Sequence, residues 1–193
     1  MVTGGQNVLG VDPGATGGLV LLSPSGRVLE KHVMPVREEG GLDLQTLGRL
    51  LFHLCDHVQL CVLERPNGTV MTRGHGAGQS VASMFNFGKT CGQIEGMLAA
   101  FRIPYALVHP ATWTAALHKG QDRKLPSWHK SLICVERYFP VEDFRGSSRA
   151  RKPHDGLVDA ALLATFGRLA LACDPLIPEK WHGLPVEARK DCA

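Results

Sequence analysis

The chain has 193 residues, of which 44% are hydrophobic and 20% are charged, and its formal net charge is +3. This composition is typical of a globular protein, and the length suits one domain with a core and a short tail. Because no stretch approaches the roughly 18 apolar residues that span a bilayer, we expect no membrane partner. The small positive charge is compatible with nucleic acid binding but does not by itself indicate it.

The N-terminal residues lack the basic region of a signal peptide and lead directly into a predicted strand. Six cysteines are scattered along the chain without close pairs. Their spacing fits neither a zinc site nor a small disulfide scaffold, and it favours reduced, mostly buried thiols. We therefore expect a cytoplasmic protein.

Two apolar runs, residues 8–11 and 19–22, flank a turn that is rich in glycine. Runs of this kind predict an antiparallel hairpin whose strands are buried on both faces of a sheet. Asp12 ends the first run. A carboxylate in a central strand is costly to bury, so it needs hydrogen bonds, a charged partner or a metal ion.

The next segments predict a third antiparallel strand over 27–34 and a helix over 44–58 with Asp43 as its N-cap. A short apolar strand over 59–64 follows and ends in Glu64. A strand, a helix and a strand of these lengths form a crossover unit, which lays the new strand parallel to one of the earlier strands.

A polar, glycine-rich segment over 67–79 predicts an exposed loop, and a long helix is predicted over 80–100. Gly88, Gly92 and Gly96 recur along that helix at steps of four. Glycine destabilises a helix interior by about 1 kcal/mol per site, so three in register indicate close backbone approach. Either the helix packs tightly on its own sheet, or it packs against a second protomer.

The C-terminal half predicts one more strand, further helices with basic loops between them, and an aperiodic tail. The predicted elements are a strand at 105–109, helical turns at 111–117, loops at 119–125 and 141–152, helices at 127–138 and 155–171, and the tail at 175–193.

Four carboxylates are candidates for one shared site: Asp12, Glu64, Asp155 and Asp159. Asp155 and Asp159 lie four residues apart and therefore share a helix face. Several carboxylates at one place repel one another unless cations neutralise them, and hard oxygen ligands favour Mg²⁺ or Mn²⁺. Two such ions can activate a water and stabilise a leaving oxygen in phosphodiester cleavage.

Each acid also has an ordinary structural explanation. Asp155 and Asp159 could be first-turn acids that the helix dipole favours. Glu64 could form an ion pair with the adjacent Arg65. Asp12 has the weakest explanation of this kind, because an acid rarely occupies a central strand without a function.

Five motifs, in order over most of the chain, resemble those of RuvC-type Holliday-junction resolvases of the RNase H-like nuclease superfamily, especially the phage and related bacterial branch. The motifs are Gly-Val-Asp-Pro-Gly at 10–14, Leu-Glu-Arg-Pro at 63–66, and the segments 79–88, 103–113 and 154–164.

The resemblance implies an α/β fold, an RNase H-like five-stranded mixed sheet flanked by helices on both faces. The nuclease domain would span 1–173 and the tail 174–193, with the first and fourth strands adjacent. The implied activity is that of a crossover junction endodeoxyribonuclease, a homodimer that cuts four-way DNA junctions symmetrically with two Mg²⁺ or Mn²⁺ ions per site. Such an enzyme acts in DNA recombination and repair, in a bacterial cell or a phage-infected host.

By motif position, Asp12, Glu64 and Asp159 correspond to metal-binding catalytic acids. The family often has an acid or a histidine three residues before the last of these, where this chain has Gly156. Asp155 is the expected replacement, and His154 is the alternative. The dimer helix of the family corresponds to the predicted helix over 80–100, with interface residues Met84, Phe85, Gly88, Gly92 and Gly96.

The family tends to place a lysine after the residue that matches Trp113, but this chain has Thr114 there. Lys119, Lys124 and Lys130 are alternative sources of that phosphate contact. Basic groups beside the acids would contact the DNA backbone without reading sequence. The predicted DNA-binding residues are Arg73, Lys119, Lys124, Lys130, Arg149, Arg151, Lys152 and His154.

Three alternatives stay open from the sequence. A nuclease of the same fold could act on RNA or on branched and flap DNA without junction preference. A junction-binding module without catalysis would carry acids that do not converge. The aspartate followed by a Gly/Thr turn also resembles the phosphate loop of the actin and sugar-kinase superfamily, but 193 residues leave no room for its two domains.

Overall fold

The computed structural model describes residues 7–65 and 81–182, which form one mixed five-stranded sheet covered by helices. The strand order is β3-β2-β1-β4-β5. β1 pairs antiparallel with β2 and parallel with β4, so the predicted sheet and the predicted adjacency of the first and fourth strands are confirmed. The strands are β1 (Asn7–Asp12), β2 (Gly18–Leu22), β3 (Val28–Val33), β4 (Val58–Glu64) and β5 (Tyr105–Val108).

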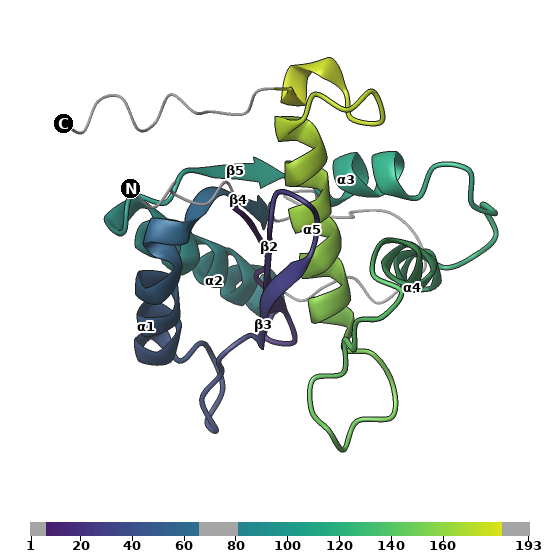
Figure 1. The fold of residues 1–193 in the computed structure, drawn as a ribbon. Coiled ribbons are helices and arrows are strands. Elements are labelled where there is room, and N and C mark those ends of the chain that lie inside the picture. The colour runs from purple at the N-terminus through teal and green to yellow at the C-terminus, as the bar shows by residue number, and fades with distance from the viewer. Residues whose placement is uncertain (1–6, 66–80, 183–193) are drawn as a thin grey trace.

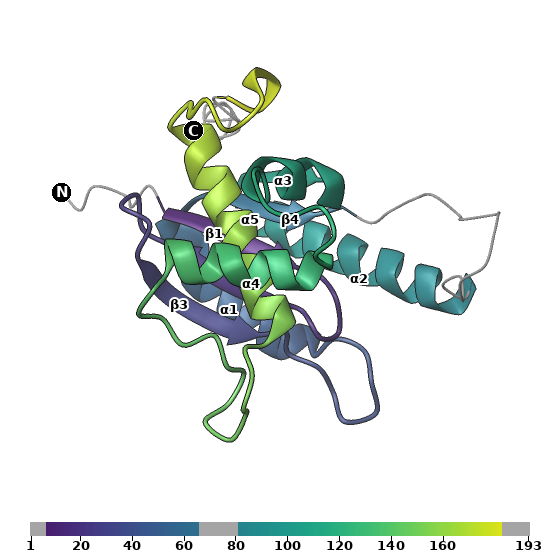
Figure 2. The same ribbon diagram turned by 90° about the vertical axis from the view of Figure 1, so that its right-hand side faces the viewer.

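Helices cover both faces of this sheet, and each face has its own apolar core (Figures 1 and 2). One face carries α3, α4 and α5, and α5 lies directly across the sheet. The other face carries α1 and α2, and the N-terminal half of α2 extends beyond the sheet (Figure 2). The helices are α1 (Leu44–Leu54), α2 (Val81–Ala100), α3 (Pro110–Leu117), α4 (Ser127–Tyr138) and α5 (Asp155–Leu171).

The start of α1 confirms its predicted cap, but its end differs from the prediction. The Asp43 carboxylate accepts hydrogen bonds from the backbone N–H groups of Gln45 and Thr46. The helix ends at Leu54 rather than at Val58, and a 3₁₀ turn over Cys55–His57 follows it. Val58 opens β4 and pairs with Asn7. An apolar residue in phase with both a helix and the next strand cannot be assigned from periodicity alone.

The chain after α5 packs back on the core for a few residues. Ile177 is buried, and the Trp181 ring contacts the Phe166 ring edge-on with centroids 5.8 Å apart. The first part of the predicted tail therefore belongs to the packed structure, while residues 183–193 lie outside the described part. The domain boundary at 173 stays a prediction.

The described cysteines are free, and Cys61, Cys91 and Cys134 are buried, as expected of unpaired thiols. Over residues 7–65 and 81–182, no helix combines the length and the apolar character needed to cross a bilayer.

Candidate active site

Two of the predicted acids lie side by side at one edge of the sheet. Val11 of β1 is paired with Leu63 of β4 in a parallel ladder, so Asp12 and Glu64 are the next residues of neighbouring strands. Side chains alternate between the faces of a sheet. Because Leu9, Val11, Cys61 and Leu63 belong to the core under α1 and α2, Asp12 and Glu64 face the side on which α5 lies.

Glycines bring the start of α5 into contact with this edge. A side chain at Gly10 would collide with the Ala160 carbonyl and the Ala164 backbone nitrogen, so α5 rests directly on β1. A side chain at Gly156 would collide with the backbone of Thr16 and Gly17 in the β1–β2 turn. The position three residues before Asp159 therefore has no space for an acid, which explains why this chain has glycine there.

Asp159 of α5 completes the cluster. Ser131, a buried serine of α4, lies close enough to Asp159 for its hydroxyl to lower the pKa of that carboxyl. Burial raises the pKa of Asp159 to about 6, and the charges of Asp12 and Asp155 add to the rise. Since the charge of Asp12 raises the pKa of Asp159, the carboxylates of β1 and α5 are close enough to interact electrostatically.

Glu64, at the end of β4, is also coupled electrostatically to the other two acids. Burial raises its pKa to about 7, and the charges of Asp12 and Asp159 contribute. The Trp113 indole N–H of α3 donates to Glu64 Oε2 at 2.8 Å, which favours the ionised carboxylate and limits the rise. The pKa of Asp12 is also raised by burial, against the backbone N–H of Gly14, which donates to its Oδ1 at 3.1 Å. We call Asp12, Glu64 and Asp159 the acid cluster.

The acid cluster fits divalent cations by its chemistry. Three partly buried carboxylates that raise one another's pKa are stabilised when a cation neutralises them, and all their donor atoms are hard oxygens. Over residues 7–65 and 81–182, however, no three His, Cys, Asp or Glu side chains are arranged as ligands of a single ion. The three carboxylates therefore lie in one region of the structure, but their oxygen atoms are not close enough together to bind one ion at the same time.

The two alternatives for a further ligand occupy different positions. Asp155 is exposed at the first residue of α5, and its charge raises the pKa of Asp159. His154, just before α5, lowers the pKa of Asp12 by its positive charge. Its Nδ1 is buried and has no hydrogen-bond partner among the described residues. Both side chains therefore lie near the acid cluster, and the choice between them stays a prediction.

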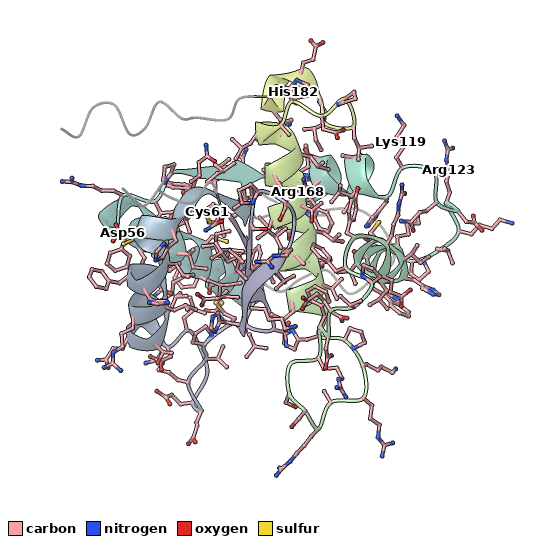
Figure 3. The ribbon with its side chains drawn as sticks, viewed as in Figure 1. Asp56, Cys61, Lys119, Arg123, Arg168 and His182 are labelled. Carbon is pink, nitrogen blue, oxygen red and sulfur yellow. The ribbon has the colours of Figure 1, made fainter. Side chains whose placement is uncertain are left out.

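The described candidates for DNA binding lie on the loop that leads into α5, on the α3–α4 loop and on α4. Arg149, Arg151 and Lys152 are exposed on the loop that leads into α5. Lys119 and Lys124 are exposed on the α3–α4 loop, and Lys130 is partly buried on α4. Arg73 lies outside the described residues. In Figure 3, Lys119 projects away from the body of the molecule.

The sequence did not indicate the residues that orient the acids. Trp113 ends one of the five motifs, and its indole N–H is the only feature of the sequence to indicate that it could hold a carboxylate. Ser131 carries no such signal, because a serine within an amphipathic helix is usually exposed. His118 adds a third polar group, since its Nε2 lies 3.3 Å from Ser131 Oγ.

No protein-family model matches the sequence, and no curated protein is significantly similar to it. The strand order and the helices on both faces define an RNase H-like α/β fold. Among solved structures, the fold is similar to RuvC of T. thermophilus in complex with a Holliday junction substrate, with a TM-score of 0.59 and 16% identity. A second structure of Thermus thermophilus RuvC gives a TM-score of 0.56 and 17% identity. Both alignments cover 86% of this chain and 96% of the other, so the chain has a RuvC-like fold.

Proposed function

We propose that this protein is a structure-specific DNA endonuclease that resolves four-way junctions by divalent-metal-dependent hydrolysis of phosphodiester bonds. The observation that carries the proposal is the convergence of Asp12, Glu64 and Asp159 at one edge of a RuvC-like sheet. Clusters of acids with raised pKa values are typical of functional sites. An ordinary ion pair does not explain these carboxylates, because a basic partner would lower their pKa values. Burial and the neighbouring acids raise the pKa values of Glu64 and Asp159 instead.

The cofactor we propose is Mg²⁺ or Mn²⁺, two ions per site, held by the acid cluster together with Asp155 or His154. Two bound ions supply an activated water and stabilise the leaving oxygen. The indole N–H of Trp113 on α3 orients Glu64 by a hydrogen bond, and the hydroxyl of Ser131 on α4 lies near Asp159 and lowers its pKa. Partners of this kind typically change metal affinity or activity by about 10- to 100-fold.

The basic segments before α5 and between α3 and α4 would bind the phosphate backbone on either side of the acid cluster. Such contacts position nucleic acid and do not read its sequence. Selectivity for a branched substrate would then come from the spacing of two sites in a homodimer. In a cell the substrate would be recombining DNA in the bacterial or phage-infected cytoplasm.

We place the homodimer interface on α2. Gly88, Gly92 and Gly96 are exposed, and a side chain added at any of them would meet nothing within 4 Å. The glycines therefore do not serve close packing on the protein's own sheet. Phe85, on the same exposed helix, has 69% of its surface accessible. Met84 belongs to α2, but its side chain lies outside the described part.

Cleavage of a synthetic mobile four-way junction tests the proposal. With Mg²⁺ or Mn²⁺ we expect paired, symmetric cuts on opposing strands, mapped on all four strands. Asp12→Asn should abolish nicking and leave junction binding intact. Equal cleavage of Y-shaped, linear and four-way DNA would instead support a broader nuclease of the same fold, and binding without cleavage would support a non-catalytic module.

A further inference from the structure

A pocket of about 1090 Å³ opens between the loop that leads into α1 and the N-terminal half of α2. We propose that this α1–α2 pocket binds the base of a nucleotide next to the phosphate that is cut, and so gives the protein a preference among bases; the inference rests on the proposed function. The volume is sufficient for a whole nucleotide, since pockets of up to about 1,000 Å³ hold drug-sized molecules. The lining residues on which the proposal depends are Ala15, Gln45, Asn86, Phe87, Lys89 and Gln93.

Three carboxamide groups in the pocket have unused hydrogen-bonding capacity. The side chains of Gln45, Asn86 and Gln93 form no hydrogen bond with another described residue. Each carboxamide offers two N–H donors and a carbonyl acceptor. Such a group suits the edge of a nucleobase, which also presents donors and acceptors side by side. The pocket therefore contains groups that can distinguish one base from another.

Most of the charged groups around the pocket already have partners. Arg37 lies 3.5 Å from Glu39, so their charges largely cancel. The Asp43 carboxylate accepts the hydrogen bonds that cap α1. Lys89 is exposed on α2 and forms no ion pair with another described residue. A site with one uncommitted cation among neutral amides suits an uncharged base whose own phosphate lies at the rim, rather than a phosphate group alone.

One face of α2 brings the recognition groups together. Asn86, Lys89 and Gln93 follow one another at steps of three and four residues, so they share a face of the helix. Phe87, which is partly buried, adds an aromatic ring to the pocket. Bases of every kind stack on aromatic rings. The ring therefore favours a flat ligand, and the amides supply the choice among flat ligands.

The β1–β2 turn places the pocket beside the acid cluster. Ala15 is exposed in that turn and lines the pocket. The preceding residue, Gly14, donates its backbone N–H to Asp12 Oδ1 at 3.1 Å. The pocket and the acids thus lie on the two sides of one short turn. A strand whose phosphate reaches the acid cluster can place a neighbouring base across the turn, which is why we assign the pocket to a nucleotide next to the cut.

The first test uses free nucleotides and needs no nuclease activity. The metal-free protein is titrated with each of the four deoxynucleoside 5′-monophosphates and with deoxyribose 5-phosphate, while the side-chain amide resonances of Gln93 are followed by NMR. We expect a saturable shift with at least one nucleotide and none with the sugar phosphate. Asn86→Ala should bind the tightest nucleotide about fivefold more weakly, the usual effect of one lost hydrogen bond, and alanine keeps the helix because it has the higher helix propensity.

Gln59→Ala is the matched control for this titration. Gln59 carries the same functional group but lies near the start of β4, outside the pocket, so its variant should bind nucleotides as the wild type does. The absence of a saturable shift, an equal response to the sugar phosphate, or unchanged affinity in Asn86→Ala would overturn the pocket.

The second test asks whether the pocket acts on the substrate. Junctions that carry each of the four bases on either side of the mapped cut are cleaved, and the rates with the best and the poorest base are compared. We expect Asn86→Ala to reduce their ratio about fivefold and Gln59→Ala to leave it unchanged. Equal rates with all four bases in the wild type, or the same ratio in Asn86→Ala, would overturn the assignment to a substrate base. Nucleotide binding by a protein that binds and cuts no junction would refute the proposed function and leave the nucleotide pocket standing.

Discussion

Replacing Glu64 by Gln should make the metal-free protein more stable at alkaline pH while it removes a candidate metal ligand. The pKa of Glu64 is raised from 4.5 to about 7, chiefly by burial. A carboxyl group with a raised pKa binds its proton more tightly in the folded protein than in the unfolded chain. Its ionisation therefore destabilises the fold progressively as the pH rises from about 4.5 to about 7.

The size of the effect follows from the shift. Each pKa unit corresponds to about 1.4 kcal/mol, so the ionised Glu64 lowers the free energy of unfolding by about 3 kcal/mol at pH 8. A glutamine never ionises, and its amide oxygen can still accept the Trp113 hydrogen bond. We expect Glu64→Gln to exceed the wild type by about 3 kcal/mol at pH 8 and by about 1 kcal/mol or less at pH 5.

Urea unfolding in EDTA at both pH values measures this difference. Glu136→Gln on the exposed surface of α4 is the matched control and should follow the wild type at both pH values. Adding Mg²⁺ or Mn²⁺ should stabilise the wild type at pH 8 more than Glu64→Gln, because ligand binding to the folded state adds to stability. If Glu64→Gln is no more stable than the wild type at pH 8, the account of a strained acid cluster is wrong.

Three further changes test the packing, the orientation of Glu64 and the interface. Gly156→Ala should lower the free energy of unfolding in urea by about 1 to 3 kcal/mol, because the new methyl group meets the β1–β2 turn. Gly48→Ala in α1, where a side chain would meet nothing within 4 Å, should instead raise it by up to about 1 kcal/mol; equal effects would contradict the contact at Gly156. Trp113→Phe removes the N–H that favours the ionised form of Glu64, so the pKa of Glu64 should rise. We expect the acidic limb of the pH–rate profile to move to higher pH and the rate near pH 7 to fall about tenfold. An acidic limb that does not move would mean that Trp113 does not act on the site. Gly92→Leu should give a folded monomer by sedimentation, and a variant that stays dimeric would move the interface away from this face.

The strands and their carboxylates were predictable because the signals are local. An apolar run that ends in Asp12, a glycine-rich turn and a second apolar run specify the hairpin without help from distant residues. Glu64 follows a run of the same kind. That the two strands are neighbours came from the resemblance and not from the pattern, since a crossover unit fixes the direction of a strand but not its place in the sheet.

The groups that orient the acids depend on contacts between distant segments, which no local pattern encodes. Trp113 reaches Glu64 only because α3 follows β5, the neighbour of β4. Ser131 reaches Asp159 only because α4 packs on α5. The need for glycine at 156 likewise appears only when α5 lies against the β1–β2 turn. Tertiary packing decided these positions.

The parallel pairing of β1 with β4, with α5 laid across both, has a consequence for biosynthesis. The residues of the acid cluster come from β1, β4 and α5, and α5 is the last long helix among the described residues. A nascent chain carries Asp12 early and Glu64 later, but it has no Asp159 until nearly the whole domain has been translated. The proposed nuclease could not cut nucleic acid while it is still being made, because α5, the helix that completes its core, also supplies the third carboxylate of its acid cluster.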